Sequence, residues 1–218
     1  MARQMRSIVP GVRIYEERPP DPNNYLLEGG RRRYLVDTCS TLNGNPYRLQ
    51  PAFTHLDGII LTHPHFDHVA GIDYFPGVPV MAHENAMRAV NAGDDRIQLA
   101  GAFGVELPKG RVGRTLVDGE KLDVGGVRFE VISTPGHCTG SLCLFEPESR
   151  SLLSGDTVFT SGSVPRVDFP SANLGELLDS YEKLLSLEVN LVLPGHGPVS
   201  SNGSAIISGA LKLLRALK

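Results

Sequence analysis

Three histidines and an aspartate crowd the segment from residue 63 to residue 68. This segment reads His63-Pro64-His65-Phe66-Asp67-His68 and directly follows an apolar run, Gly58 to Thr62, that predicts a β-strand. A chain of this composition would contain such an H-x-H-x-D-H pattern by chance roughly 4 times in 10,000. The pattern therefore indicates side chains gathered to bind metal rather than a run of surface histidines.

The spacing inside this segment fits two neighbouring cations. At the end of a strand, side chains at i and i+2 point the same way, so His63 and His65 can reach one ion. We expect the chain then to turn into a helix, which swings Asp67 and His68 toward a second position. Pro64 lacks a backbone donor and stiffens the turn between the first two histidines.

Further ligand-type residues occupy turns that follow other predicted strands. These residues are Asp37, His137, Asp156 and His196, and a glycine precedes each of the last three. Any one of them alone would more often stabilise a turn than bind a ligand. Together with the segment 63–68, however, they predict a single metal site assembled from distant parts of the chain.

The rest of the sequence predicts short alternating elements. Runs rich in Val, Ile and Leu, bounded by turn residues, predict strands at 35–36, 58–62, 78–82, 127–133, 151–154 and 189–193. Leucine-rich stripes with helical spacing predict helices over 174–185 and 206–217. The 218 residues are 41% hydrophobic, which is enough for one sizeable core. We therefore expect an α/β layered fold in a single domain over residues 1–218.

The net charge and the apolar pattern argue against nucleic acid and membranes as binding partners. A net charge of −3 provides no broad basic field, so no nucleic-acid partner is expected. Arg31 to Arg33 follow two glycines and indicate the start of a hairpin strand more than a phosphate site. The C-terminal helical stripe favours packing on the core over binding a membrane surface, and no apolar run is long enough to span a bilayer.

The N-terminal segment and the cysteines indicate in which cellular compartment the protein is expected. Met1 to Val12 lack the apolar stretch of a signal peptide. Cys39, Cys138 and Cys143 match no disulfide framework or zinc knuckle. The sequence therefore predicts a cytoplasmic protein that acts on a small-molecule substrate, and it leaves the choice between monomer and homodimer open.

Taken in order, the motifs from Asp37 to His196 resemble those of the metallo-β-lactamase fold superfamily, in particular its glyoxalase II-like hydrolase branch. The resemblance implies an αββα sandwich, two facing sheets with helices outside, with a dinuclear metal centre at one edge. It assigns the ligands as follows: His63, His65 and His137 on the first metal, Asp67, His68 and His196 on the second, and Asp156 bridging both. It also implies that Asp37 orients the ligands.

Five imidazoles and two carboxylates without a thiolate suit two Zn²⁺ ions, and they tolerate Fe or Mn. A hydroxide that bridges two such metals forms near neutral pH and can attack the carbonyl of a small thioester, ester or lactone. We expect Asp67 to steer this hydroxide and to take its proton. Asp67 and Asp37 are thus the candidate catalytic residues beside the ligands.

Departures from particular relatives refine this expectation. Asp156 is intact, whereas true metallo-β-lactamases usually carry Cys or Ser there, and Phe159 stands where quorum-quenching lactonases have tyrosine. The run from Gly155 to Phe159 resembles glyoxalase II. Only 22 residues follow His196, however, too few for the glutathione-binding extension of that enzyme.

An oxygenase is the main alternative to a hydrolase, because some oxygenases share the same fold. Relatives that resemble persulfide dioxygenases use a single iron, and His63, His137 and Asp156 could supply its two-His, one-carboxylate triad. A nuclease or a non-catalytic binding module is less favoured, because the chain lacks a basic face and its ligand set is complete.

Several neighbouring residues keep open roles. We expect Cys138 to be a packed side chain, His83 to be structural and His55 to lie near the surface. Arg166 and Asp168 form an ion pair that orders a loop, or they contact substrate. Substrate selection is assigned to the loops between residues 81 and 112 and after residue 156.

Overall fold

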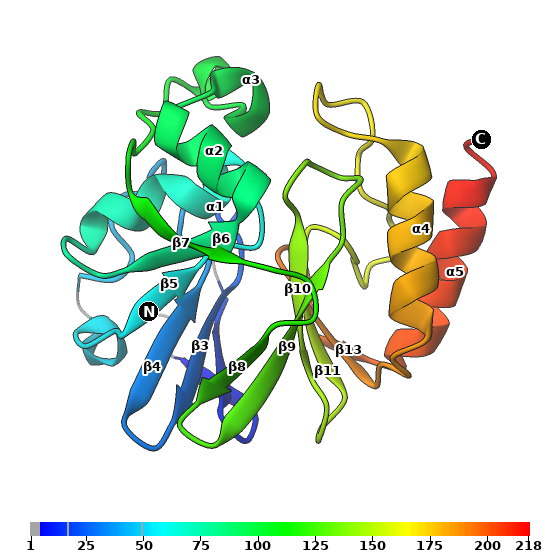
Figure 1. Cartoon of the computed structure of the whole chain (residues 1–218), viewed down its shortest axis with the longest axis horizontal. Coiled ribbons are helices and arrows are strands. Elements are labelled where there is room, and N and C mark those ends of the chain that lie inside the picture. The colour runs from blue at the N-terminus through cyan, green and yellow to red at the C-terminus, as the bar shows by residue number, and fades with distance from the viewer. Residues whose placement is uncertain (1–4, 17, 49) are drawn as a thin grey trace.

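Two facing β-sheets form the centre of the molecule, and helices cover their outer sides (Figure 1). The structure is a computed structural model that describes residues 5–16, 18–48 and 50–218. The predicted α/β class and the αββα layering are confirmed. The first four residues of the segment Met1 to Val12 lie outside the described residues, and its remainder includes a strand.

Within the described residues, the first sheet holds seven strands in the order of the sequence. They are β1 (Arg6–Val9), β2 (Val12–Tyr15), β3 (Asn24–Gly29), β4 (Arg32–Val36), β5 (Gly58–Ile60), β6 (Val80–His83) and β7 (Val112–Leu116). Strands β1 to β4 pair antiparallel, and β4 to β7 pair parallel. Gly29 pairs with Arg32 across the β3–β4 hairpin, which confirms that the arginine triplet begins a hairpin strand.

The second sheet, in the part of the chain that the structure describes, holds six strands in the order β13-β12-β11-β10-β9-β8. Their bounds are β8 (Lys121–Val124), β9 (Val127–Ser133), β10 (Leu142–Glu146), β11 (Ser151–Gly155), β12 (Leu191–Pro194) and β13 (Ser200–Ser201). Strands β11 and β12 are parallel, and the helix between them returns the chain to the same end of the sheet. As a result, β11 and β12 both point their carboxyl ends toward one edge of the sandwich.

Helices cover each sheet on the side away from its partner. The first sheet carries α1 (Phe66–Val69), α2 (Glu84–Ala92), α3 (Asp95–Gln98) and 3₁₀ turns at Pro51–Phe53, Ala70–Tyr74 and Gly101–Phe103. The second sheet carries α4 (Leu174–Leu185) and α5 (Gly203–Arg215), which lie side by side in Figure 1. Among the described residues, no helix is both long and apolar enough to cross a lipid bilayer.

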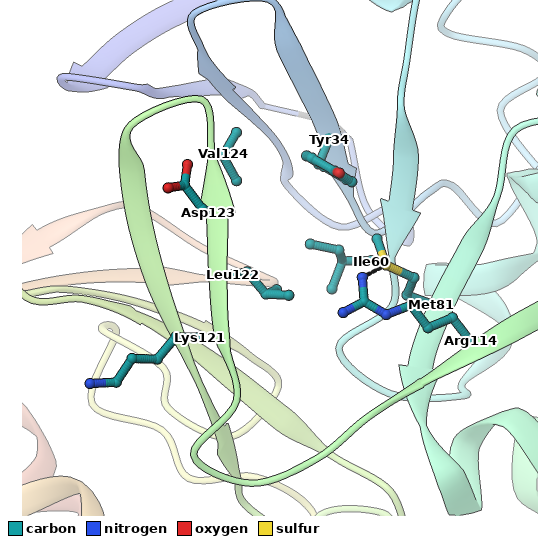
Figure 2. A pocket seen from close by; sticks show the side chains of 8 residues that line it. All are labelled: Tyr34, Ile60, Met81, Arg114, Lys121, Leu122, Asp123 and Val124. Atoms are coloured by element: carbon teal, nitrogen blue, oxygen red, sulfur yellow. Dashed lines mark hydrogen bonds between the residues drawn. The ribbon is translucent and has the colours of Figure 1, made fainter.

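Strand β8 shows how alternation builds the core between the sheets. Leu122 and Val124 are buried against the first sheet, whereas Lys121 and Asp123 are exposed. A cavity of about 120 Å³ remains here, and Figure 2 shows Arg114 from β7 lying across it with its guanidinium against the sulfur of Met81. The cavity contains none of the predicted metal ligands.

Several predicted strands have different bounds in the structure, and hydrogen bonds explain the difference for two of them. The strand predicted over 58–62 ends at Ile60 because Thr62 leaves the first sheet and its carbonyl accepts a hydrogen bond from Leu142 of the second sheet, at 2.8 Å. The strand predicted from residue 189 begins at Leu191, since the carbonyl of Val189 accepts the backbone N–H of Ser204 at 2.8 Å and so holds the start of α5. The first shift places the histidine segment between the two sheets.

Candidate metal centre

All seven predicted ligand residues meet at the carboxyl ends of the parallel strands. The residues form three overlapping groups of three. Within each group, every residue offers one nitrogen or oxygen atom, and these atoms all lie within 4.8 Å of one another. The groups are His63, His65 and His137; His63, His68 and Asp156; and Asp67, His68 and His196. The segment after β5, the β9–β10 turn and the ends of β11 and β12 supply these side chains.

Three histidines form the more enclosed half of this cluster. The Nδ1 atom of His65 lies 3.1 Å from Nε2 of His63 and 3.1 Å from Nε2 of His137. Burial lowers the pKa of His65 to about 3, and burial also lowers the pKa values of His63 and His137. The rings are therefore neutral near pH 7, and each can direct a lone pair at a shared cation.

The other half combines two histidines with two carboxylates. Nε2 of His196 lies 3.1 Å from Oδ2 of Asp67 and 3.4 Å from Nε2 of His68. Asp156 lies between the halves, with Oδ1 at 3.4 Å from His68 and Oδ2 at 3.8 Å from His137. Burial would raise the pKa of Asp156, but the imidazoles of His68 and His196 hold it well below its usual range.

The unpaired atoms of the cluster test whether a cation fits it. Among the described residues, three buried side-chain atoms lack a hydrogen-bond partner, and two of them, Nε2 of His65 and Oδ1 of Asp156, belong to this cluster. An ionised carboxylate oxygen buried without a donor is costly unless a positive charge faces it. Imidazole and carboxylate donors also match the preferences of zinc and iron. The cluster is thus suited to binding metal ions.

Asp37 fixes two of the imidazoles through one hydrogen-bond chain. It follows β4 in a left-handed conformation, with φ of 59°, and its Oδ1 accepts the backbone N–H of Thr62 at 2.7 Å. Its Oδ2 accepts from the Thr62 hydroxyl at 2.7 Å and from Nδ1 of His68 at 2.8 Å. The Thr62 oxygen in turn lies 3.0 Å from Nδ1 of His63, so both rings present Nε2 to the cluster.

We predict that Asp37→Asn lowers metal affinity and turnover by roughly 10 to 100-fold, because an amide cannot accept all three of these hydrogen bonds. Asparagine tolerates the left-handed backbone, so the fold should be retained. Chelator-competition titration and steady-state kinetics measure the two effects. Asp57→Asn is the matched control, since Asp57 accepts the N–H of Arg33 at 2.8 Å away from the cluster. If both variants have the same metal affinity and turnover, Asp37 does not orient the ligands.

The glycine before His137 is required by close packing. Gly136 has φ of 130°, and a Cβ there would lie 2.4 Å from the backbone nitrogen of Leu177 in α4. The carbonyl of Gly136 also accepts the N–H of Asn173 at 2.8 Å, and Nδ1 of His137 donates to the carbonyl of Arg166 at 3.2 Å. Helix α4 and the loop before it therefore set the position of His137.

We predict that Gly136→Ala lowers the free energy of unfolding by about 2 to 4 kcal/mol, from backbone strain and the clash with α4. Gly209→Ala should have the opposite sign and stabilise by about 0.5 to 1 kcal/mol. Gly209 is exposed on α5, and a Cβ there meets nothing within 4 Å. Urea denaturation of both variants measures these values. Equal effects would show that packing does not require the glycine before His137.

Two residues near the site had no signal in the sequence. The Asn23 side chain donates to the carbonyls of Pro194 at 3.0 Å and Gly197 at 2.8 Å. The Tyr25 hydroxyl also donates to the carbonyl of Pro194, at 2.8 Å. These contacts hold the turn that carries His196 from residues in or next to β3, more than 160 residues earlier in the chain, so no local spacing predicts them.

The residues with open roles are also located. His83 accepts the N–H of Asn85 at the start of α2, which is a structural role, and His55 is exposed. Cys138 is buried, and burial raises the pKa of its thiol to about 12. Arg166 forms a bidentate ion pair with Asp168, at 2.8 Å and 2.6 Å, and it also lines the cavity beside the cluster, so the predicted ion pair is present and contact with substrate stays a prediction.

Comparison with known proteins agrees with this geometry. The profile of the metallo-beta-lactamase superfamily matches residues 18–196. The chain is 35% identical to the probable metallo-hydrolase YqgX of Bacillus subtilis (strain 168), over 71% of this chain and 74% of that protein. It is 29% identical to the acyl-coenzyme A thioesterase MBLAC2 of Gallus gallus, over 80% of this chain and 72% of that protein. The crystal structure of TTHA1623 in a di-iron-bound form superposes with a TM-score of 0.70 at 33% identity, covering 86% of this chain and 93% of that one.

Proposed function

Since the chain belongs to the metallo-beta-lactamase superfamily, we propose that it is a dinuclear metal-dependent hydrolase whose substrate is an acyl thioester. The observation that carries the proposal is the placement of Asp156 between two groups of imidazoles, with a buried carboxylate oxygen that has no hydrogen-bond donor. A similar chain is named as a thioesterase, and another binds two irons. Zinc is the first choice of metal, with iron and manganese as alternatives.

The roles of the side chains follow from their positions. His63, His65 and His137 would hold one ion, Asp67, His68 and His196 the other, and Asp156 would bridge them. Divalent ions held there would supply a water of lowered pKa as nucleophile and a Lewis acid for the substrate carbonyl.

Asp67 is placed to handle the proton of the reaction. Burial would raise the pKa of Asp67, but the imidazoles of His68 and His196 lower it overall, so its carboxylate is ionised near neutral pH. It also lines the cavity in front of the cluster. We assign to Asp67 the orientation of the attacking water and the acceptance of its proton at a carboxylate oxygen.

A combined metal and activity assay tests this proposal. The purified protein should contain close to two metal ions per chain and should hydrolyse acyl thioesters, which release of free thiol detects. Esters and lactones of the same acyl group serve as comparison substrates. One iron per chain together with oxygen uptake on glutathione persulfide would overturn the proposal in favour of a sulfur oxygenase.

A further inference from the structure

We infer that the cavity in front of the metal centre is an acyl-chain subsite, so that the preferred thioester carries an unsubstituted apolar acyl group of several carbons. This inference rests on the proposed function and specifies its substrate class. The cavity measures about 660 Å³, within the range of about 300 to 1,000 Å³ typical of small-molecule sites. Its floor includes five of the seven cluster residues: His65, Asp67, His137, Asp156 and His196.

Two loops supply the apolar walls of this cavity. The segment between residues 81 and 112 contributes Leu99, Ala102 and Phe103, and the segment after residue 156 contributes Phe159, Val164 and Phe169. These are the two loops in which substrate selection was predicted, and Phe66 of α1 and Pro20 also line the cavity. In Figure 1 the α3 region and the loop before α4 stand at the same end of the two sheets.

Phe103 forms the outer part of the first wall. Its ring stacks on the buried Phe66 ring with centroids 4.5 Å apart and an interplanar angle of 23°, yet 53% of Phe103 is exposed. Its outer face contacts solvent instead of protein. Because burial of apolar area is favourable, a hydrocarbon chain laid against this face would gain binding energy with each methylene.

Phe169 lines the cavity directly beside the cluster. Its ring centroid lies 5.3 Å from that of His65 and 5.7 Å from that of His137, and both contacts are edge-on. The Arg166 guanidinium covers the ring at 4.3 Å. An acyl group whose carbonyl reaches the cluster would therefore have its first carbons against Phe169.

The cavity offers little that would recognise a polar acyl group. Among the described lining residues outside the cluster, Arg166 is the one with a polar side chain, and its guanidinium is already paired with Asp168. A polar substituent far along the acyl chain would lose its hydrogen bonds to water without replacement. Apolar contact thus decides which acyl chain binds.

A length series of acyl thioesters tests this inference. The acetyl, butyryl, hexanoyl and octanoyl thioesters of one thiol, N-acetylcysteamine, are assayed with the metal-loaded enzyme. We expect kcat/KM to rise by at least about a hundredfold from acetyl to octanoyl. Phe103→Ala should lower the octanoyl-to-acetyl ratio by about tenfold, and Phe103→Leu should restore part of it.

The control and the contrary outcomes separate this inference from the proposed function. Leu213→Ala removes an equally exposed side chain, 50% exposed, from α5 and should leave the wild-type ratio. If thioesters are hydrolysed equally at all lengths, or if Phe103→Ala leaves the ratio at its wild-type value, the acyl subsite is wrong while the proposed function stands. If no thioester is hydrolysed at any length, the proposed function fails and the subsite fails with it.

Discussion

Asp156→Ala should lose its bound metal and its hydrolytic activity together, with activity falling by at least about a thousandfold. Substituting a residue that only orients the ligands lowers activity by about 10 to 100-fold. We expect a larger loss here, because Asp156 lies within 4 Å of ring nitrogens in both halves of the cluster. Elemental analysis of the purified variant and a thioester assay measure the two losses.

Two further variants make this result interpretable. Asp156→Asn keeps the volume of the side chain and removes its charge, so it distinguishes lost ligation from a collapsed cavity. Asp179→Ala removes an exposed aspartate from α4 and should retain both metal and activity. An Asp156→Ala protein that is fully active with two bound metals would refute the bridging role.

Removal of the metal from the wild-type chain should abolish activity and destabilise the fold. Ligands that bind only the folded state stabilise it by about 4 kcal/mol when present at a thousand times their dissociation constant. We therefore expect the metal-free protein to unfold with a free energy about 4 kcal/mol lower, and divalent cations to restore stability and activity together. Denaturation of apo and reconstituted protein measures this difference.

The Asp156→Ala variant serves as the control for metal removal, because its stability should respond little to added cations. If chelation leaves the wild-type enzyme active and equally stable, the cluster is a purely structural group of histidines. If cations stabilise the protein without restoring turnover, the metal centre has no catalytic role.

The sequence predicted the strands whose pattern is local. In residues 127–133, Phe129 and Val131 are buried whereas Arg128 is exposed and Glu130 is half-buried, and the structure has a strand with those bounds. Strand β10, by contrast, is buried at all five positions in the middle of the second sheet and was not predicted. Helix α3 has only four residues, too short for a helical stripe, whereas α1, equally short, was expected from the spacing of the ligand residues alone.

The candidate site was predictable because its ligands share one kind of position. Asp37, His137, Asp156 and His196 all follow strands. Strands β9, β11 and β12 run in the same direction, as do β4 and β5, so within each sheet their carboxyl ends lie at one edge. The supporting contacts depend on folding instead. Thr62 joins Asp37 to His63 through its hydroxyl, which requires β4 and β5 to pair in the first sheet. Asn23 holds a turn near residue 196, a contact that exists only once the two sheets face each other.

Anomalous diffraction from a crystal of the metal-loaded protein tests the central claim most directly. We expect two peaks. One should lie within about 2.0 to 2.2 Å of ring nitrogens of His63, His65 and His137, and the other at that distance from a carboxylate oxygen of Asp67 and ring nitrogens of His68 and His196. Asp156 should contact both. No peak at this edge of the sandwich, or a single ion bound by other residues, would contradict it.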